Sequence, residues 1–79
     1  MDRKEIERLV GSCIASYIPQ SEFQPEERLK EDLGLDSLLL VNVVVDMENA
    51  LETSFDDGAL DPAELTTVES LYRLAEQSL

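Results

Sequence analysis

The stretch "LGLDSLLL", residues 33–40, decides the fold prediction for this chain of 79 residues. It places an Asp-Ser pair between apolar residues, at the point where an apolar pattern with helical spacing begins. Asp and Ser are both favoured N-cap residues, so either Asp36 or Ser37 can cap a helix here. Gly34 interrupts the preceding segment and favours a loop. The stretch therefore predicts a loop that opens into a helix and leaves the Ser37 hydroxyl exposed.

The predicted second helix runs from Ser37 to Leu51 or Glu52 and has two apolar sides. At 100° per residue its core face consists of Leu40, Val43, Val44, Met47, Ala50 and Leu51. The opposite side carries the polar residues Asn42, Asp46, Glu48, Asn49 and Glu52. Leu38, Val41 and Val45 share that polar side as a second, narrower apolar stripe that starts beside Ser37.

Two further helices are predicted from the same kind of pattern. The first has a long apolar stripe of Ile6, Leu9, Val10, Cys13, Ile14, Tyr17 and Ile18. Asp2 and Glu5 form its expected cap, and Pro19 ends it. The last helix begins with a predicted capping box from Thr66 to Glu69. Its apolar face consists of Val68, Leu71, Tyr72, Leu74 and Ala75.

The remaining segments are connections. Residues 19–35 form a long loop, in which Phe23, Leu29, Leu33 and Leu35 are expected to reach the core. Asp61, Pro62 and Glu64 indicate the start of a short helix. No segment alternates as a strand does. The prediction is an all-α fold in a single domain, residues 1–79: a four-helix bundle of three main helices plus one short helix, with a long loop between the first and second helices.

Composition excludes several classes of function. Eighteen acids against six bases give a formal net charge of −12, which excludes a nucleic-acid footprint and argues against anionic membrane surfaces. It favours partners with basic surfaces. The single cysteine, Cys13, is expected in the core and cannot form an intramolecular disulfide. The lack of histidine excludes histidine-based triads and the usual zinc sites. With no long apolar run and no signal-type N-terminus, the cytoplasm is the expected compartment.

The remaining side chains match neither a metal site nor a catalytic site. If Gly58 is the sixth residue of a calcium loop, Asp57, Asp61 and Glu64 fall at ligand positions, but Thr53 and Phe55 stand where carboxylates or amides are needed. No metal site is therefore predicted. The acids have the pattern of solvated helix faces, so no catalytic residue is predicted either.

Two interpretations of Ser37 remain open from the residues themselves. In one, it caps the helix and does nothing else. In the other, it carries a phosphate-linked group, which a helix N-terminus favours because its free N–H groups and dipole point at the anion. The apolar stripe of Leu38, Val41 and Val45 beside it favours the second interpretation, because it has no evident core partner.

The chain resembles the acyl carrier protein family. Residues 33–38 are similar to its signature around the modified serine, and the motif residues here are Gly34, Asp36, Ser37 and Leu38. Val41, Val44, Met47 and Glu48 continue the pattern of the family's second helix, and residues 66–68 match the start of its last helix. The resemblance extends over nearly the whole chain.

The resemblance implies a free-standing carrier with 4′-phosphopantetheine attached to Ser37. A phosphopantetheinyl transferase would install the group from coenzyme A, using Mg²⁺ bound to the transferase. The thiol of the arm would hold acyl groups as thioesters, and the carrier, expected to be a monomer, would catalyse nothing. Ketosynthases or acyltransferases would dock on the second helix, on a surface made of Asp36, Leu38, Val41, Val45, Asp46 and Glu48.

The pathway stays open between fatty-acid and polyketide or other secondary-metabolite biosynthesis. Many fatty-acid carriers have an acid where Asn42 stands and polar residues where Leu39 and Leu40 stand, and the segment between Phe55 and Val68 is longer here than is usual. An alternative from another class is an acidic helical adaptor that binds partners without any modification of Ser37.

Overall fold

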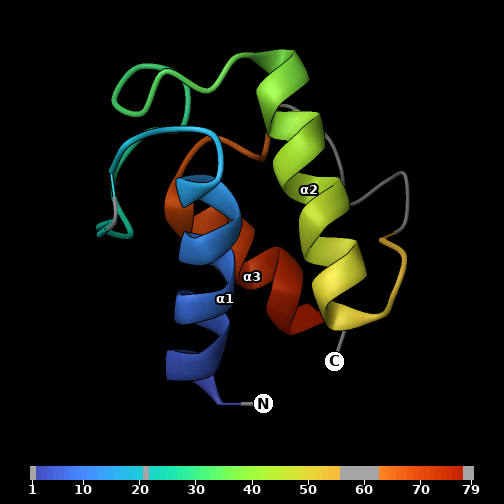
Figure 1. Cartoon of the computed structure of the whole chain (residues 1–79). Helices are drawn as coiled ribbons and strands as arrows, with labels where there is room; N and C mark the ends of the chain where they lie inside the picture. Colours follow the sequence, from blue (N-terminus) through green and yellow to red (C-terminus); the bar gives the residue numbers. More distant parts are fainter. Residues whose placement is uncertain (1, 21, 56–62, 78–79) are drawn as a thin grey trace.

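The computed structural model describes residues 2–20, 22–55 and 63–77, and these residues form three helices. They are α1 (Arg3–Ala15), α2 (Ser37–Leu51) and α3 (Val68–Gln77). Helices α1 and α2 run in opposite directions, and α3 crosses behind them (Figure 1). The predicted all-α fold, with three main helices and a long loop between the first two, is confirmed.

Helix α1 begins as predicted and ends earlier. The Asp2 side chain accepts a hydrogen bond from the Glu5 N–H at 2.9 Å, which caps the helix. The last helical residue is Ala15, not Ile18. Pro19 has no N–H to bond the carbonyl four residues before it, which is that of Ala15. Tyr17 and Ile18 therefore lie beyond the helix, although both still pack partly buried against the core.

The core lies where the three helices meet. Its buried residues are Ile6, Val10, Cys13, Ile14, Leu29, Leu33, Leu35, Val43, Val44, Met47, Phe55, Leu65, Val68, Leu71, Tyr72, Leu74 and Ala75. The predicted core face of α2 is correct except for Ala50, which is exposed. Ala50 lies in the last turn of α2, at the edge of the apolar face, and its short side chain does not reach the core.

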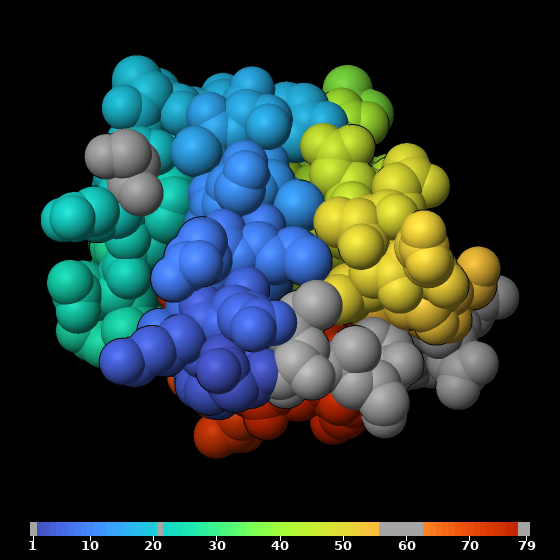
Figure 2. Space-filling view, turned by 60° about the horizontal axis from the view of Figure 1, so that its bottom comes forward, coloured from blue at the N-terminus to red at the C-terminus, as the bar shows by residue number. Residues whose placement is uncertain are grey.

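The long connection is held in place by backbone hydrogen bonds to the start of α3. The Leu29 N–H donates to the Thr66 carbonyl at 2.9 Å, and the Val68 N–H donates to the Glu27 carbonyl at 3.0 Å. The first-turn N–H groups of a helix have no partner inside the helix, so the Glu27 carbonyl satisfies a donor of α3 that would otherwise be free. Figure 2 shows α1 lying between this connection and the second half of α2.

The cap of α3 differs by one residue from the prediction. Ser70 and Thr67 bond each other reciprocally: the Ser70 N–H donates to Thr67 Oγ1 at 3.3 Å, and the Thr67 N–H donates to Ser70 Oγ at 3.1 Å. Glu69, the expected partner of Thr66, instead forms ion pairs with Arg3 of α1 and Arg73. Glu69, which the sequence spacing assigns to the cap, thus contacts another helix instead.

The predicted short helix lies mostly outside the described residues, which leave out Asp61 and Pro62; Ala63 and Glu64 are in a turn. Most of residues 53–64, which resemble a calcium loop only in part, are also outside the described residues. Within the described residues, no three His, Cys, Asp or Glu side chains are grouped to hold a metal ion. None of the helices in this part of the chain is long and apolar enough to cross a membrane.

Candidate functional site

Two buried leucines fix the approach of the chain to α2. Leu33 and Leu35 are both buried, and exposed Gly34 stands between them with a φ of 73°. That left-handed conformation is one glycine adopts without a steric penalty. The Leu35 N–H donates to the Leu29 carbonyl at 2.8 Å, which holds the turn closed. As a result, the chain enters α2 from a fixed turn, with exposed Asp36 directly after the buried Leu35.

Asp36, and not Ser37, caps α2. Its Oδ1 accepts a hydrogen bond from the Leu39 N–H at 2.9 Å, and its backbone carbonyl accepts from the Leu40 N–H at 2.9 Å. Ser37 is the first helical residue. Of the two capping candidates that the sequence allows, the structure selects Asp36, so the interpretation in which Ser37 serves only as the cap is wrong.

The Ser37 side chain is exposed and makes no hydrogen bond to any described residue. The backbone N–H groups of Ser37 and Leu38 likewise have no partner in the described part of the chain. Such first-turn N–H groups point out of the helix start and attract an anion. A phosphate joined to the Ser37 hydroxyl would therefore meet free donors, so these residues fit the attachment of a phosphate-linked group.

Two pockets open beside Ser37. One has a volume of about 200 Å³ and extends along α2; the described residues that line it are Ser37, Leu40, Val41, Val44, Val45, Glu48 and Leu65. The other, of about 250 Å³, lies toward the connection and is lined by Leu29, Lys30, Glu31, Leu35, Asp36, Ser37, Leu40, Leu65 and Thr66. Leu65 borders both pockets. It was not among the predicted site residues, because nothing in its local pattern points to α2.

The second apolar stripe of α2 is on the surface, as the sequence predicts. Leu38 is 70% exposed, Val41 57% and Val45 44%. Among the described residues, these three are the large apolar side chains that are exposed to solvent. Exposed apolar side chains grouped on one helix face are typical of interaction sites.

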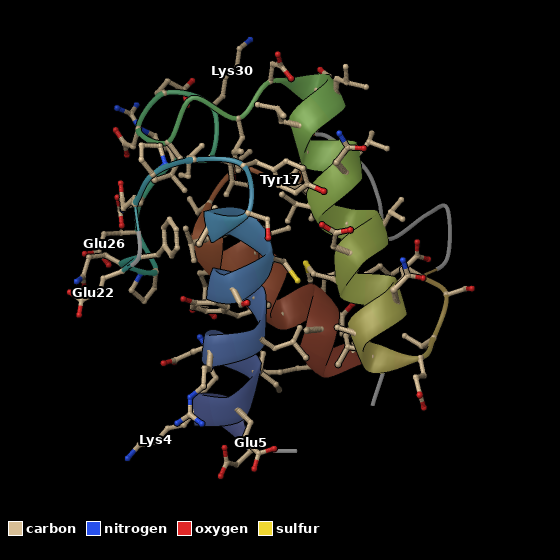
Figure 3. The ribbon with its side chains drawn as sticks, viewed as in Figure 1. Lys4, Glu5, Tyr17, Glu22, Glu26 and Lys30 are labelled. Atoms are coloured by element: carbon tan, nitrogen blue, oxygen red, sulfur yellow. The ribbon has the colours of Figure 1, made fainter. Side chains whose placement is uncertain are left out.

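The two acids of α2 are tied to other parts of the fold. Asp46 Oδ2 accepts a hydrogen bond from the Tyr17 hydroxyl at 2.6 Å, and Figure 3 shows Tyr17 reaching from the end of α1 toward α2. Glu48 Oε2 accepts from the Phe55 N–H at 2.7 Å. Both acids are half-buried. The hydrogen bond to the Asp46 carboxylate, with burial, raises the pKa of Tyr17, because an anion beside the phenol opposes its ionisation.

Tyr17 is a residue whose role sequence reasoning missed. Its spacing places it on the core stripe of α1, and no local signal pairs it with a residue 29 positions later.

Cys13 is in the core, as predicted. Burial, and to a smaller extent the nearby Asp46 carboxylate, raises the pKa of the Cys13 thiol and so disfavours its reactive thiolate form.

Comparison with known proteins agrees with this geometry. Residues 9–75 match a family model described as a phosphopantetheine attachment site. The chain is 34% identical to an acyl carrier protein of Saccharopolyspora erythraea, over 99% of this chain and 90% of the relative. It is also 34% identical to an acyl carrier protein of Thermotoga maritima, over 98% and 95% of the two chains. The acyl carrier protein of Desulforapulum autotrophicum is 39% identical over 78% of this chain and 70% of the relative.

The matched residues include the second half of α1, the whole of α2 and most of α3. The relatives are matched over most of their own length, so the similarity is to whole carrier proteins and not to a shared fragment. The predicted family resemblance and the predicted cofactor are confirmed: the chain belongs to the acyl carrier proteins, the family that carries phosphopantetheine.

Proposed function

We propose that this carrier holds 4′-phosphopantetheine on the hydroxyl of Ser37 and carries acyl groups as thioesters on the thiol of that arm. The observation that supports Ser37 most directly is its hydroxyl, which is exposed at the first residue of α2 and has no hydrogen-bond partner among residues 2–20, 22–55 and 63–77. Asp36 already caps the helix, so Ser37 is free for another purpose. The carrier itself catalyses nothing; the chemistry belongs to the enzymes that load and use the arm.

The surroundings of Ser37 support a role in shielding cargo. The pocket of about 200 Å³ along α2 is lined mainly by apolar side chains. Burial of apolar surface is favourable, so an acyl chain folded back from the arm gains stability there. This pocket suits a short hydrocarbon chain, of the kind that fatty-acid and polyketide biosynthesis both produce.

The proposed partners are a phosphopantetheinyl transferase and the enzymes that transfer or extend acyl groups, such as ketosynthases and acyltransferases. They would meet the surface around Ser37. The residues proposed for this contact are Asp36, Leu38, Val41, Val45, Asp46 and Glu48. Their association is expected to be brief, because a carrier must leave one enzyme to reach the next.

The test is the intact mass of the protein before and after incubation with coenzyme A, Mg²⁺ and a broad-specificity phosphopantetheinyl transferase. A gain equal to one phosphopantetheine, mapped by peptide analysis to Ser37, is expected. Ser37→Ala is the matched variant. It should keep the helical circular dichroism spectrum, because Asp36 makes the cap, and should gain no mass.

Two outcomes would contradict the proposal. A mass gain in Ser37→Ala would place the group on another residue. A folded, unmodified wild-type chain that several transferases leave unchanged would favour an adaptor that binds partners without modification.

A further inference from the structure

One basic side chain lies beside Ser37 and pairs with no described residue. Lys30 and Ser37 line the same pocket of about 250 Å³, and Lys30 is the only base among the described residues that line either pocket next to Ser37. The Lys30 side chain is exposed and forms no ion pair within the described part of the chain. We propose that Lys30 pairs with the phosphate of the 4′-phosphopantetheine arm and sets the direction in which the arm leaves Ser37. This inference rests on the proposed attachment at Ser37.

Backbone hydrogen bonds hold Lys30 close to the start of α2. The Lys30 carbonyl accepts a hydrogen bond from the Gly34 N–H at 3.2 Å, and the carbonyl of buried Leu29 accepts one from the Leu35 N–H at 2.8 Å. These bonds join the segment around Lys30 to the turn that leads into Ser37. Figure 3 shows Lys30 projecting at the end of the molecule where α2 begins. The fold therefore fixes the backbone of Lys30 beside the attachment point, and its flexible stem can follow a group that projects from there.

The surroundings of Ser37 are otherwise unfavourable for a phosphodiester. The group would add a negative charge to a chain whose formal net charge is already −12. Glu31 and Asp36 line the same pocket as Ser37 and carry negative charge as well. Like charges repel and opposite charges attract, so the phosphate is expected on the side of the pocket where the ammonium group of Lys30 lies.

The other bases of the chain are paired with acids or belong to another surface. Three arginines form ion pairs with acids of the fold: Arg3, Arg28 and Arg73. Lys4 and Arg8 line a separate groove between α1 and the long connection. Figure 3 shows Lys4 at the opposite end of the molecule from Lys30. Lys30 is therefore the base that the structure offers to the arm.

The first experiment compares the chemical reactivity of the two lysines of the chain, Lys4 and Lys30. The full chain is loaded with coenzyme A, Mg²⁺ and a broad-specificity phosphopantetheinyl transferase, and the intact mass verifies the loading. Apo and holo chains are then treated with a limiting amount of an acetylating reagent, and peptide mass mapping gives the acetylation rate of each lysine. Pairing with an anion favours the charged ammonium group, which does not react, so pairing slows the acetylation of Lys30. Lys4 is the internal control, because it is exposed and distant from Ser37.

Exposed ion pairs are weak, and salt screens them. The acetylation rate of Lys30 divided by that of Lys4 should therefore be about two- to fivefold lower in the holo chain than in the apo chain at low salt. The difference should disappear in about 1 M sodium chloride. An equal ratio in the two chains would overturn the inference. So would a decrease that persists at high salt, because the arm would then cover Lys30 without pairing with it.

The ³¹P NMR spectrum of the holo chain provides the second test. Lys30→Met should move the phosphodiester resonance, and Lys30→Arg should leave it close to the wild-type position because it keeps the charge. Lys4→Met is the matched control and should not move the resonance. Circular dichroism verifies that each variant is folded. Equal resonance positions in Lys30→Met and Lys4→Met would contradict the pairing while leaving Ser37 as the attachment site.

Failure of the attachment itself has a different signature. A folded wild-type chain that several transferases leave unmodified, with no gain in intact mass, would contradict the attachment at Ser37 and with it the pairing.

Discussion

At the scale of single residues, the start of α2 divides two tasks between neighbours. Asp36 satisfies the Leu39 N–H and so stabilises the helix. The Ser37 hydroxyl and the N–H groups of Ser37 and Leu38 have no partner among the described residues. A Ser cap would hold its hydroxyl against the backbone, where a transferase could not use it. For the proposed attachment at Ser37, the acid before the serine is therefore part of what leaves the hydroxyl available.

A second residue stands out at the other end of α2. Glu52 adopts a left-handed conformation, with φ 54° and ψ 45°, where it ends the helix. This conformation destabilises a residue that has a Cβ atom by about 1 kcal/mol or more, and glycine adopts it without that cost. We expect Glu52→Gly to raise the free energy of unfolding by about 1 kcal/mol, measured by urea denaturation.

The control for this substitution is Glu52→Ala. It removes the same negative charge from the C-terminal end of the helix, where an anion is unfavourable, but keeps a Cβ atom. The glycine variant should be the more stable of the two. Equal stability would mean that relief of charge, and not of backbone strain, explains any gain.

At the scale of elements, two side-chain links join the helices. The Tyr17–Asp46 hydrogen bond connects the segment after α1 to the middle of α2. Arg3 connects the start of α1 to α3: it forms ion pairs with Glu69 and Glu76, and its guanidinium lies 4.9 Å from the centre of the Tyr72 ring. These carboxylates raise the pKa of Arg3 further above its ordinary range, so it stays charged throughout.

Arg3→Gln should lower the free energy of unfolding by about 1 kcal/mol at low salt, because exposed ion pairs and one cation–π contact are each worth a fraction of that. Urea denaturation measures the change. Lys4→Gln is the matched control, since it removes the same charge from the next position of α1, and the structure gives Lys4 no ion pair with a described residue.

The difference between these two variants should shrink in about 1 M salt, where screening acts within a few ångströms. If Lys4→Gln were as destabilising as Arg3→Gln at low salt, the loss would come from the overall charge and not from the link between α1 and α3.

At the scale of the whole molecule, the charge of −12 works against the compact state. Acids crowd some edges: Figure 3 shows Glu22 and Glu26 projecting from the same side of the long connection. Added salt screens this repulsion. We therefore expect the melting temperature, followed by circular dichroism, to rise by several degrees from low to about 0.5 M sodium chloride.

The double variant Glu22→Gln/Glu26→Gln tests the cause. It should melt higher than the wild type at low salt and respond less to added salt. A wild-type melting temperature that does not depend on salt would show that the repulsion is already balanced by the ion pairs of the fold.

The sequence by itself determined the features that depend on neighbours along the chain. Helical spacing of apolar residues placed α1, α2 and α3, and Asp2 capped α1 as its position before Glu5 predicts. The same spacing separated the core face of α2 from the stripe of Leu38, Val41 and Val45. Both follow from the geometry of one helix, in which side chains three and four residues apart share a face.

Only the tertiary structure decided which of several local options each side chain takes. Asp36 and Ser37 are equally good caps by sequence, and the turn fixed by Leu33 and Leu35 selects Asp36. Glu69 is a good capping partner by sequence, but in the structure it forms an ion pair with Arg3 of another helix. The hydrogen bond that holds Asp46 comes from Tyr17, 29 residues away. Propensity ranks local choices within about 1 kcal/mol, and a contact across the fold is large enough to change that order.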